Sequence, residues 1–145
     1  MVDEQRATGM HEHVLTLESA VLKDIPAIVE FVVEWLQRRK LDKYIFPFEM
    51  AVDEASTNVV KYAYGGQAGF IQISCAFEGR DIVVTIRDRA RKFDPASVPA
   101  PEVDSALEDR KVGGLGIYMM KKMMDRVDYS YKEGEGNRLL LVKSV

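Results

Sequence analysis

Two pairs of strand-like segments, each joined by a short turn containing glycine, most strongly limit the folds open to this chain. Residues 70–77 and 82–87 alternate in polarity around the turn Glu78-Gly-Arg-Asp81, and residues 127–132 and 138–143 flank the turn Glu133-Gly-Glu-Gly-Asn137. Such turns join neighbouring strands in antiparallel hairpins. We therefore predict a mainly antiparallel sheet built from two hairpins and a further strand at residues 13–17.

Helical patterns separate these strands. Asp24 and Pro26 mark the start of a first helix, whose predicted core face carries Ile25, Ile28, Val29, Val32, Val33 and Leu36. A second helix is predicted over residues 47–64, before Gly65-Gly66, and a third over residues 115–125. This order predicts an α+β fold: a two-layer α/β sandwich with helices on one face of a mainly antiparallel mixed sheet.

Length and composition fit one domain. The 145 residues, 47% of them hydrophobic, predict a domain over residues 13–145 after a loose polar tail at residues 1–12. The net charge of −3, with both signs mixed along the chain, offers no broad basic surface for nucleic acid or an anionic membrane. The single Cys75 excludes an internal disulfide, and no apolar run is long enough for a secretory or membrane-spanning segment, so a cytoplasmic protein is expected.

The second predicted helix carries a polar pair. Glu54 and Asn58 lie four residues apart, opposite the Val52 and Val59 stripe, so both are expected to leave the core face in the same direction. Such a pair is often only a solvated helix face. The functional alternative makes Glu54 a general base and Asn58 an oxygen ligand of Mg²⁺, with Lys61 reaching phosphate from the same side.

Two further segments suggest a nucleotide site. Asp88 ends a strand, where its carboxylate can accept a hydrogen bond from an exocyclic amino group or serve simple turn chemistry. Gly113-Gly-Leu-Gly116 begins a helix, where backbone amides attract phosphate or where glycine merely loosens the helix start. The chain lacks a P-loop segment. Together with the Glu54–Asn58 pair, these segments predict an ATP site.

The three segments, in this order, resemble the ATPase superfamily of gyrase, histidine kinases and MutL (GHKL, the Bergerat fold), and most closely its anti-sigma-factor serine/threonine kinase branch. The resemblance spans residues 13–143 and includes Glu54-Ala-Ser-Thr-Asn58, the run from Asp88 through Phe93 to Pro95, and Met124-Asp125. It implies ATP and Mg²⁺ as cofactors, with Glu54 as catalytic base, Asn58 as Mg²⁺ ligand and Asp88 as the adenine-recognising group. The implied phosphate-side residues are Gly113, Gly114, Leu115 and Gly116, beneath a mobile lid at residues 96–112.

One position departs from the family pattern. Ala90 stands where the family usually has glycine, between Arg89 and Arg91-Lys92. If the backbone there has a positive φ, alanine costs about 1 kcal/mol and disturbs the adenine pocket. The flanking basic residues attract phosphate or an acidic partner, or simply form a solvated loop.

The resemblance implies a protein serine/threonine kinase that phosphorylates an anti-anti-sigma partner of the STAS family. A sigma factor is a further expected partner, and homodimers are common in the family. Glu54 favours this kinase, whereas Ala90 favours the alternative of a non-catalytic, nucleotide-switched regulatory binding module. A detached histidine-kinase catalytic domain is a weaker alternative, because His11 and His13 lie in a short tail and not on a phosphoacceptor helix.

Overall fold

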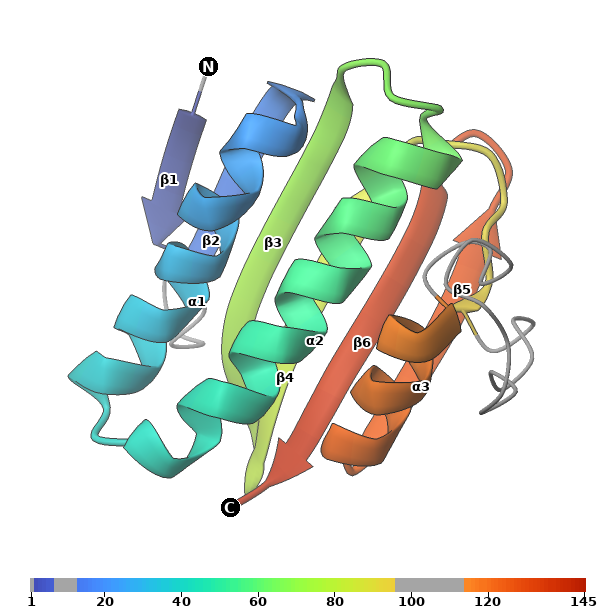
Figure 1. The fold of residues 1–145 in the computed structure, drawn as a ribbon. Helices are drawn as coiled ribbons and strands as arrows, with labels where there is room; N and C mark the ends of the chain where they lie inside the picture. Colours follow the sequence, from blue (N-terminus) through green and yellow to red (C-terminus); the bar gives the residue numbers. More distant parts are fainter. Residues whose placement is uncertain (1, 7–12, 96–113) are drawn as a thin grey trace.

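The computed structural model describes residues 2–6, 13–95 and 114–145, which form one antiparallel sheet and the helices packed on it (Figure 1). The six strands lie in the order β1-β2-β3-β4-β6-β5. The predicted α+β fold is confirmed. The sequence predicts a mixed sheet, but every described strand pair is antiparallel. Strands β3 and β4, and β5 and β6, are joined as hairpins, and two helices connect β2 to β3. The strands are β1 Val2–Arg6, β2 His13–Ala20, β3 Gly69–Glu78, β4 Asp81–Asp88, β5 Arg126–Lys132 and β6 Gly136–Ser144.

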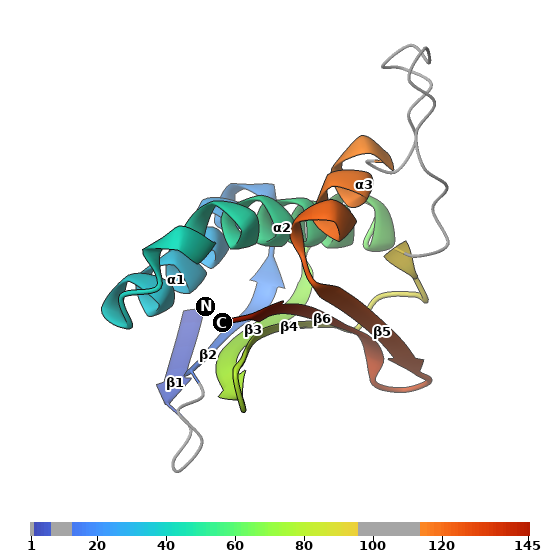
Figure 2. The same cartoon turned by 90° about the horizontal axis from the view of Figure 1, so that it is seen from below.

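Helices α1 Ile25–Arg38, α2 Ile45–Asn58 and α3 Gly114–Met123 lie together on one face of this sheet, as Figure 2 shows from below. No described helix covers the opposite face. Short 3-10 turns, Leu22–Asp24 and Asp42–Tyr44, precede α1 and α2. No helix in the described part of the chain has the length and apolarity needed to cross a membrane. Within the described residues, α1, α2 and α3 form the second layer, over one face of the sheet.

The core lies between the helices and the sheet. Helix α1 buries Ile25, Ile28, Val32 and Leu36 as predicted, and also Phe31 and Trp35, which the predicted core face left out. Val29 packs against the core but is only partly buried. Trp35 reaches β3 and lies 5.3 Å, centroid to centroid, from Phe77. The largest side chains with almost no exposed surface are Ile28, Val32, Trp35, Leu36, Phe48, Ile71, Ile73, Ile82, Ile86, Ile117, Met120 and Leu141.

The N-terminal tail is partly ordered, so the prediction of a loose tail is wrong for Val2–Arg6. This segment forms β1 and pairs antiparallel with β2, with Val2 opposite Leu17 and Arg6 opposite His13. Strand β1 supplies backbone partners to β2, which would otherwise be an edge strand. The sequence of β1 has no alternation of apolar and polar residues, so no local pattern predicts this strand.

Asp24 also acts differently from the prediction. Its side chain does not cap α1; Oδ2 instead accepts a hydrogen bond from the backbone N–H of Val21 at 2.8 Å. That bond closes the 3-10 turn before α1. Pro26 does lie in the first turn of α1, as predicted.

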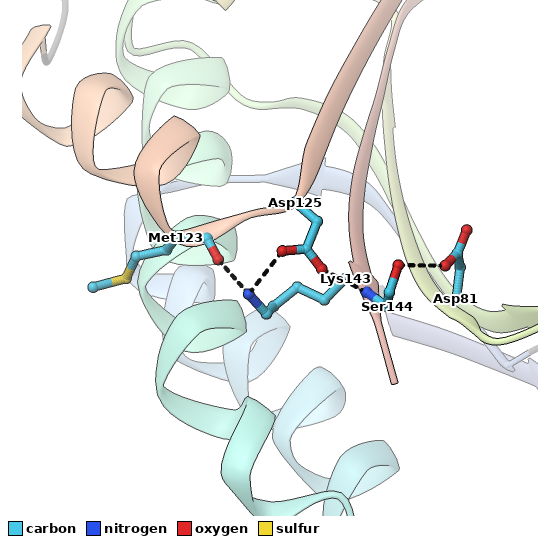
Figure 3. A network of polar contacts seen from close by, with 5 residues as sticks. All are labelled: Asp81, Met123, Asp125, Lys143 and Ser144. Carbon is cyan, nitrogen blue, oxygen red and sulfur yellow. Dashed lines mark hydrogen bonds and ion pairs between the residues drawn. The ribbon is translucent and has the colours of Figure 1, made fainter.

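A polar network attaches the end of α3 to the sheet (Figure 3). Lys143 Nζ donates to the backbone carbonyl of Met123 at 2.8 Å and lies 3.5 Å from Asp125 Oδ1. The other carboxylate oxygen of Asp125 accepts the backbone N–H of Ser144 at 2.7 Å, and this bond is the main reason that the pKa of Asp125 is lowered. The Ser144 hydroxyl continues the network to Asp81 on β4 at 2.8 Å. Asp125 therefore connects α3 with the last strand.

Replacing Asp125 by asparagine should lower the free energy of unfolding by about 1 kcal/mol, because the bond to Ser144 loses its charge and the contact with Lys143 loses its attraction. The carboxylate's lowered pKa stabilises the fold above its ordinary value of 3.8, and this contribution disappears as pH falls through the lower folded pKa. Urea unfolding at neutral pH and near pH 3 measures both effects. Asp128→Asn, which affects only a local pair with Arg126, is the matched control, and an equal loss in both variants would contradict the bridging role.

Candidate functional site

Glu54 and Asn58 are in direct contact on α2. Asn58 Nδ2 donates to Glu54 Oε2 at 2.5 Å, which leaves Asn58 Oδ1, the oxygen able to bind a metal, outside this bond. The prediction that both side chains leave the core face holds only for Glu54, because Asn58 is 4% exposed. Burial raises the pKa of Glu54 despite the opposing effect of the Asn58 hydrogen bond. A carboxylate with a raised pKa is better suited to accept a proton near neutral pH.

Helix α2 changes geometry directly after this pair. Val59–Ala63 forms a π-helical turn, a feature often found beside functional sites, and the chain then leaves through Gly65 and Gly66, both at positive φ. Lys61 lies in this turn with an exposed side chain, and its charge is the weakest of the influences on the pKa of Glu54. Its predicted contact with phosphate stays a prediction.

Asp88 is held inside a buried hydrogen-bond network at the end of β4. Its Oδ1 accepts the backbone N–H of Ala90 and Asn137 Nδ2, each at 2.8 Å. Asn137 also accepts, through Oδ1, the backbone N–H of Phe93 at 3.0 Å and the Tyr129 hydroxyl at 2.5 Å. Burial raises the pKa of Asp88, and these donors oppose the rise. The network fixes one oxygen of Asp88 and leaves Oδ2 outside these bonds.

Sequence reasoning missed Asn137 and Tyr129, which it assigned only to a turn and a strand. The local signal is the second glycine of that turn. Gly136 has φ 98°, and a Cβ there would overlap the carbonyl oxygen of Asp88. Glycine thus lets the start of β6 approach the end of β4 and brings Asn137 to Asp88.

Ala90 is not strained. Among the described residues other than glycine, only Lys40 has a positive φ, so the expected cost of alanine at position 90 is absent. Its side chain is buried, 8% exposed, beside the bond that its N–H makes to Asp88. Of the neighbouring basic residues, Arg89 lies over the Phe70 ring, with its guanidinium 4.0 Å from the ring centroid, and Lys92 is exposed.

A narrow cavity lies between this network and the helices. Its polar groups come from Asn58, Asp88, Tyr129 and Asn137, and its apolar walls come from α2, the adjoining π turn, α3, β4 and β6. Phe93 lines it as well. The cavity has a volume of about 20 Å³, enough for a water molecule but not for a nucleobase, so a ring would enter only after the walls move apart. The chemistry of the lining, mostly apolar with the Asp88 carboxylate, suits a flat heterocycle that carries an amino group. The apolar wall residues include Ala55, Val59, Ile86, Met120 and Leu139.

The first turn of α3 lies against the Glu54–Asn58 pair. A Cβ on Gly116 would overlap the carboxylate of Glu54, so a larger residue at this position would displace that carboxylate. Gly114 and Leu115 belong to the same turn, whereas Gly113 and the predicted lid at residues 96–112 lie outside the described residues. The structure thus brings together two of the three predicted segments at Glu54, Asn58 and Gly116, and holds the Asp88 segment across the cavity.

The described side chains suit Mg²⁺ only if phosphate and water oxygens complete its coordination. The described residues include no group of three His, Cys, Asp or Glu side chains able to hold a metal. Asn58 Oδ1 is one hard oxygen ligand, and Mg²⁺ commonly takes one or two protein ligands with phosphate and water oxygens. The donor set therefore fits a metal that arrives with a nucleotide.

Comparison with known proteins shows the family to which the chain belongs. Residues 19–143 match the model of the histidine kinase-like ATPase domain, so the chain belongs to that family of ATP-binding domains. It is 23% identical over 95 residues to an anti-sigma F factor of Clostridium acetobutylicum, with 66% of each chain covered. It is 27% identical to the serine/threonine-protein kinase BtrW of Bordetella bronchiseptica, over 61% of this chain and 63% of the relative.

A third relative is the serine-protein kinase RsbW of Listeria monocytogenes, 32% identical over 59% of this chain and 58% of its own. The matched region thus spans between 58% and 66% of the length of these relatives. The family resemblance drawn from the sequence is confirmed.

Replacing Asn137 by alanine should weaken ATP binding about tenfold, because Asp88 loses a donor and Phe93 and Tyr129 lose their shared acceptor. The pKa of Asp88 should then rise further, so Asp88 should take up a proton at a higher pH. As the pH is lowered, ATP binding should therefore be lost at a higher pH than in the parent. Calorimetry between pH 5 and pH 8 measures both effects. The Asn137 side chain makes four hydrogen bonds, the fourth from Nδ2 to the backbone carbonyl of Arg91 at 2.8 Å. Tyr129→Phe removes only one of them and should give a smaller loss; an unchanged affinity in Asn137→Ala would remove Asn137 from the site.

Proposed function

We propose that this protein is an ATP- and Mg²⁺-dependent protein serine/threonine kinase of the anti-sigma type, which phosphorylates an anti-anti-sigma partner of the STAS family. The observation that carries the proposal is the contact of Glu54 with Asn58, 2.5 Å apart, beneath the start of α3 at Gly116. In this contact the Glu54 carboxylate, whose pKa is raised, meets Asn58, which lines the cavity proposed for the nucleotide and offers an oxygen to a metal. The names of the relatives support the same activity.

In this proposal Oδ2 of Asp88 accepts the exocyclic amino group of adenine, and Asn137, whose amide is used within the network, holds Asp88 in place. Burial makes that hydrogen bond strong, because little water competes for the carboxylate. Phe93 and the apolar walls of the cavity cover the ring. The nucleotide's phosphates then extend toward Asn58 and the first turn of α3.

Glu54 acts on the acceptor. Its carboxylate takes the proton of a serine or threonine hydroxyl as the hydroxyl oxygen forms a bond to the γ-phosphorus, and the bond from that phosphorus to the bridging oxygen of ADP breaks. Mg²⁺, when bound, neutralises charge on the phosphates. The hydrogen bond from Asn58 orients Glu54 for proton transfer. Burial at this position raises its pKa and so favours the transfer.

The non-catalytic, nucleotide-switched binding module remains the alternative. Its main support was the strain expected at Ala90, and Ala90 has no positive φ. A sigma factor as second partner rests on the name of one relative. Dimerisation and a cytoplasmic location stay predictions.

A transfer assay decides between the two functions. The purified protein is mixed with labelled ATP, Mg²⁺ and the STAS protein encoded nearest to it. Label on a serine or threonine of that protein is the expected result. ATP binding without transfer to any such partner would support the binding module.

Changing Glu54 to glutamine should abolish transfer while ATP affinity stays within about twofold, because the amide keeps the size of the side chain but cannot accept the proton. Single-turnover transfer and calorimetry on the same preparation separate the two effects. Glu34→Gln, an exposed change on α1, is the control for charge removal. Transfer at the parental rate in Glu54→Gln would assign the base to another residue.

Changing Asp88 to asparagine should weaken ATP binding by about ten- to a hundredfold, since a hydrogen bond to a charged group contributes roughly 1.5–3 kcal/mol. The parent should bind ATP in preference to GTP, because guanine does not present an amino group at the same place. Calorimetry with both nucleotides tests this. Equal affinities for ATP and GTP, or an unaffected variant, would mean that Asp88 does not read the base.

A further inference from the structure

A wide groove runs over the outer surface of the helical layer, between α1, α2 and α3. Pro26 and Val29 of α1, Met50 of α2 and Met119 of α3 give it an apolar floor. Met50 is 39% exposed, a large fraction for an apolar side chain. Methionine side chains adapt their shape to different partners, so such a floor suits contact with a protein segment.

The polar lining of this groove carries one sign of charge. Its charged residues are Glu30, Glu49, Asp53 and Glu54, and no described Lys or Arg lines it. Neither Glu30 nor Glu49 is ion-paired to a described residue, and Asp53 accepts a hydrogen bond only from the Thr57 hydroxyl at 3.2 Å. Four carboxylates in one groove are a large local excess for a chain whose net charge is −3. The groove therefore attracts a cationic partner.

The groove ends at the catalytic pair. Glu54 and Gly116 line it, and Met120 lines both the groove and the cavity assigned to adenine. Asn58 lies on the cavity side of Glu54, within hydrogen-bond distance. A hydroxyl brought along the groove would meet Glu54 from the side opposite to the nucleotide.

We propose that this groove, lined by Glu30, Glu49, Met50, Asp53 and Met119, is the docking surface for a basic segment of a protein partner that carries the acceptor serine or threonine. The assignment rests on the proposed kinase function. Lysine or arginine residues flanking the acceptor pair with the rim carboxylates, and an apolar residue of the segment lies on the methionines. Charge complementarity sets the encounter and the register of the hydroxyl relative to Glu54.

The binding test uses two labelled peptides with the same apolar residues around one serine, one with flanking lysines and one with flanking glutamates. Fluorescence anisotropy should show binding of the lysine peptide only, weakening as salt rises. The double variant Glu30→Gln/Glu49→Gln should bind it roughly tenfold more weakly, because two exposed ion pairs are lost. The control Glu18→Gln/Glu133→Gln removes the same charge from exposed positions outside the groove and should bind as the parent does.

Methyl NMR gives the location independently of activity. The lysine peptide should shift the resonances of Met50, Met119 and Val29, and should leave Val83 and Val142, on the strands and outside the core cluster, unchanged. Equal binding of both peptides, equal loss in groove and control variants, or shifts away from the groove would overturn the proposal. The proposal would also be overturned if the resonances of the groove residues shifted with protein concentration and not with peptide concentration. That result would assign the groove to a second copy of the chain.

The same preparations separate this inference from the proposed kinase. ATP calorimetry and transfer to the STAS protein report on the nucleotide site and on catalysis, whereas peptide anisotropy and methyl shifts report on the groove. If the parent binds the lysine peptide in the groove but transfers no phosphate, the kinase fails and the docking surface stands. If it transfers phosphate but binds neither peptide, the kinase stands and the docking surface fails.

Discussion

The hydrogen bond from Asn137 to the buried carboxylate of Asp88 is the contact on which the nucleotide side of the site depends. It joins the end of β4 to the start of β6, and it exists because Gly136 lets the two backbones approach. Through the same amide the network reaches the backbone of Phe93 and the hydroxyl of Tyr129. One buried side chain thus fixes the acceptor, the segment that follows β4 and one wall of the cavity. A buried carboxylate without these donors would take up a proton and lose its role as an acceptor.

On the helical side, the close approach of α3 to α2 has the same importance. Gly116 allows the first turn of α3 to rest on Glu54, and that cover contributes to the burial that raises the carboxylate's pKa. The far end of α3 is held by Asp125 and Lys143 against the last strand. Helix α3 therefore makes contacts at both described ends, once with Glu54 and once with the sheet. A shift of α3 would change the environment of Glu54 directly.

Much of this could be read from the sequence, because the hairpins, the helices and the three motifs are local patterns of polarity and spacing. The site residues that were missed depend on contacts between distant segments: Asn137 lies 49 residues from Asp88 and looks like an ordinary turn residue. Strand β1 was missed because it pairs without an apolar pattern. Phe31 and Trp35 share the helical spacing of the other buried residues of α1, so the sequence did carry the signal for them. The supposed strain at Ala90 came from a family pattern, and only the backbone angles could test it.

The charges around Glu54 suggest how the two proposed ligands would affect each other. The site must bring polyphosphate close to a groove that carries four carboxylates, so the nucleotide alone raises the local negative charge. In the proposed complex, Mg²⁺ and Lys61 would offset part of this charge from the nucleotide side. A basic acceptor segment would offset the rest from the groove, and each ligand would then lower the electrostatic cost of binding the other. By this reasoning an acidic groove would both select a basic acceptor and favour the complex in which acceptor, metal and ATP are present together.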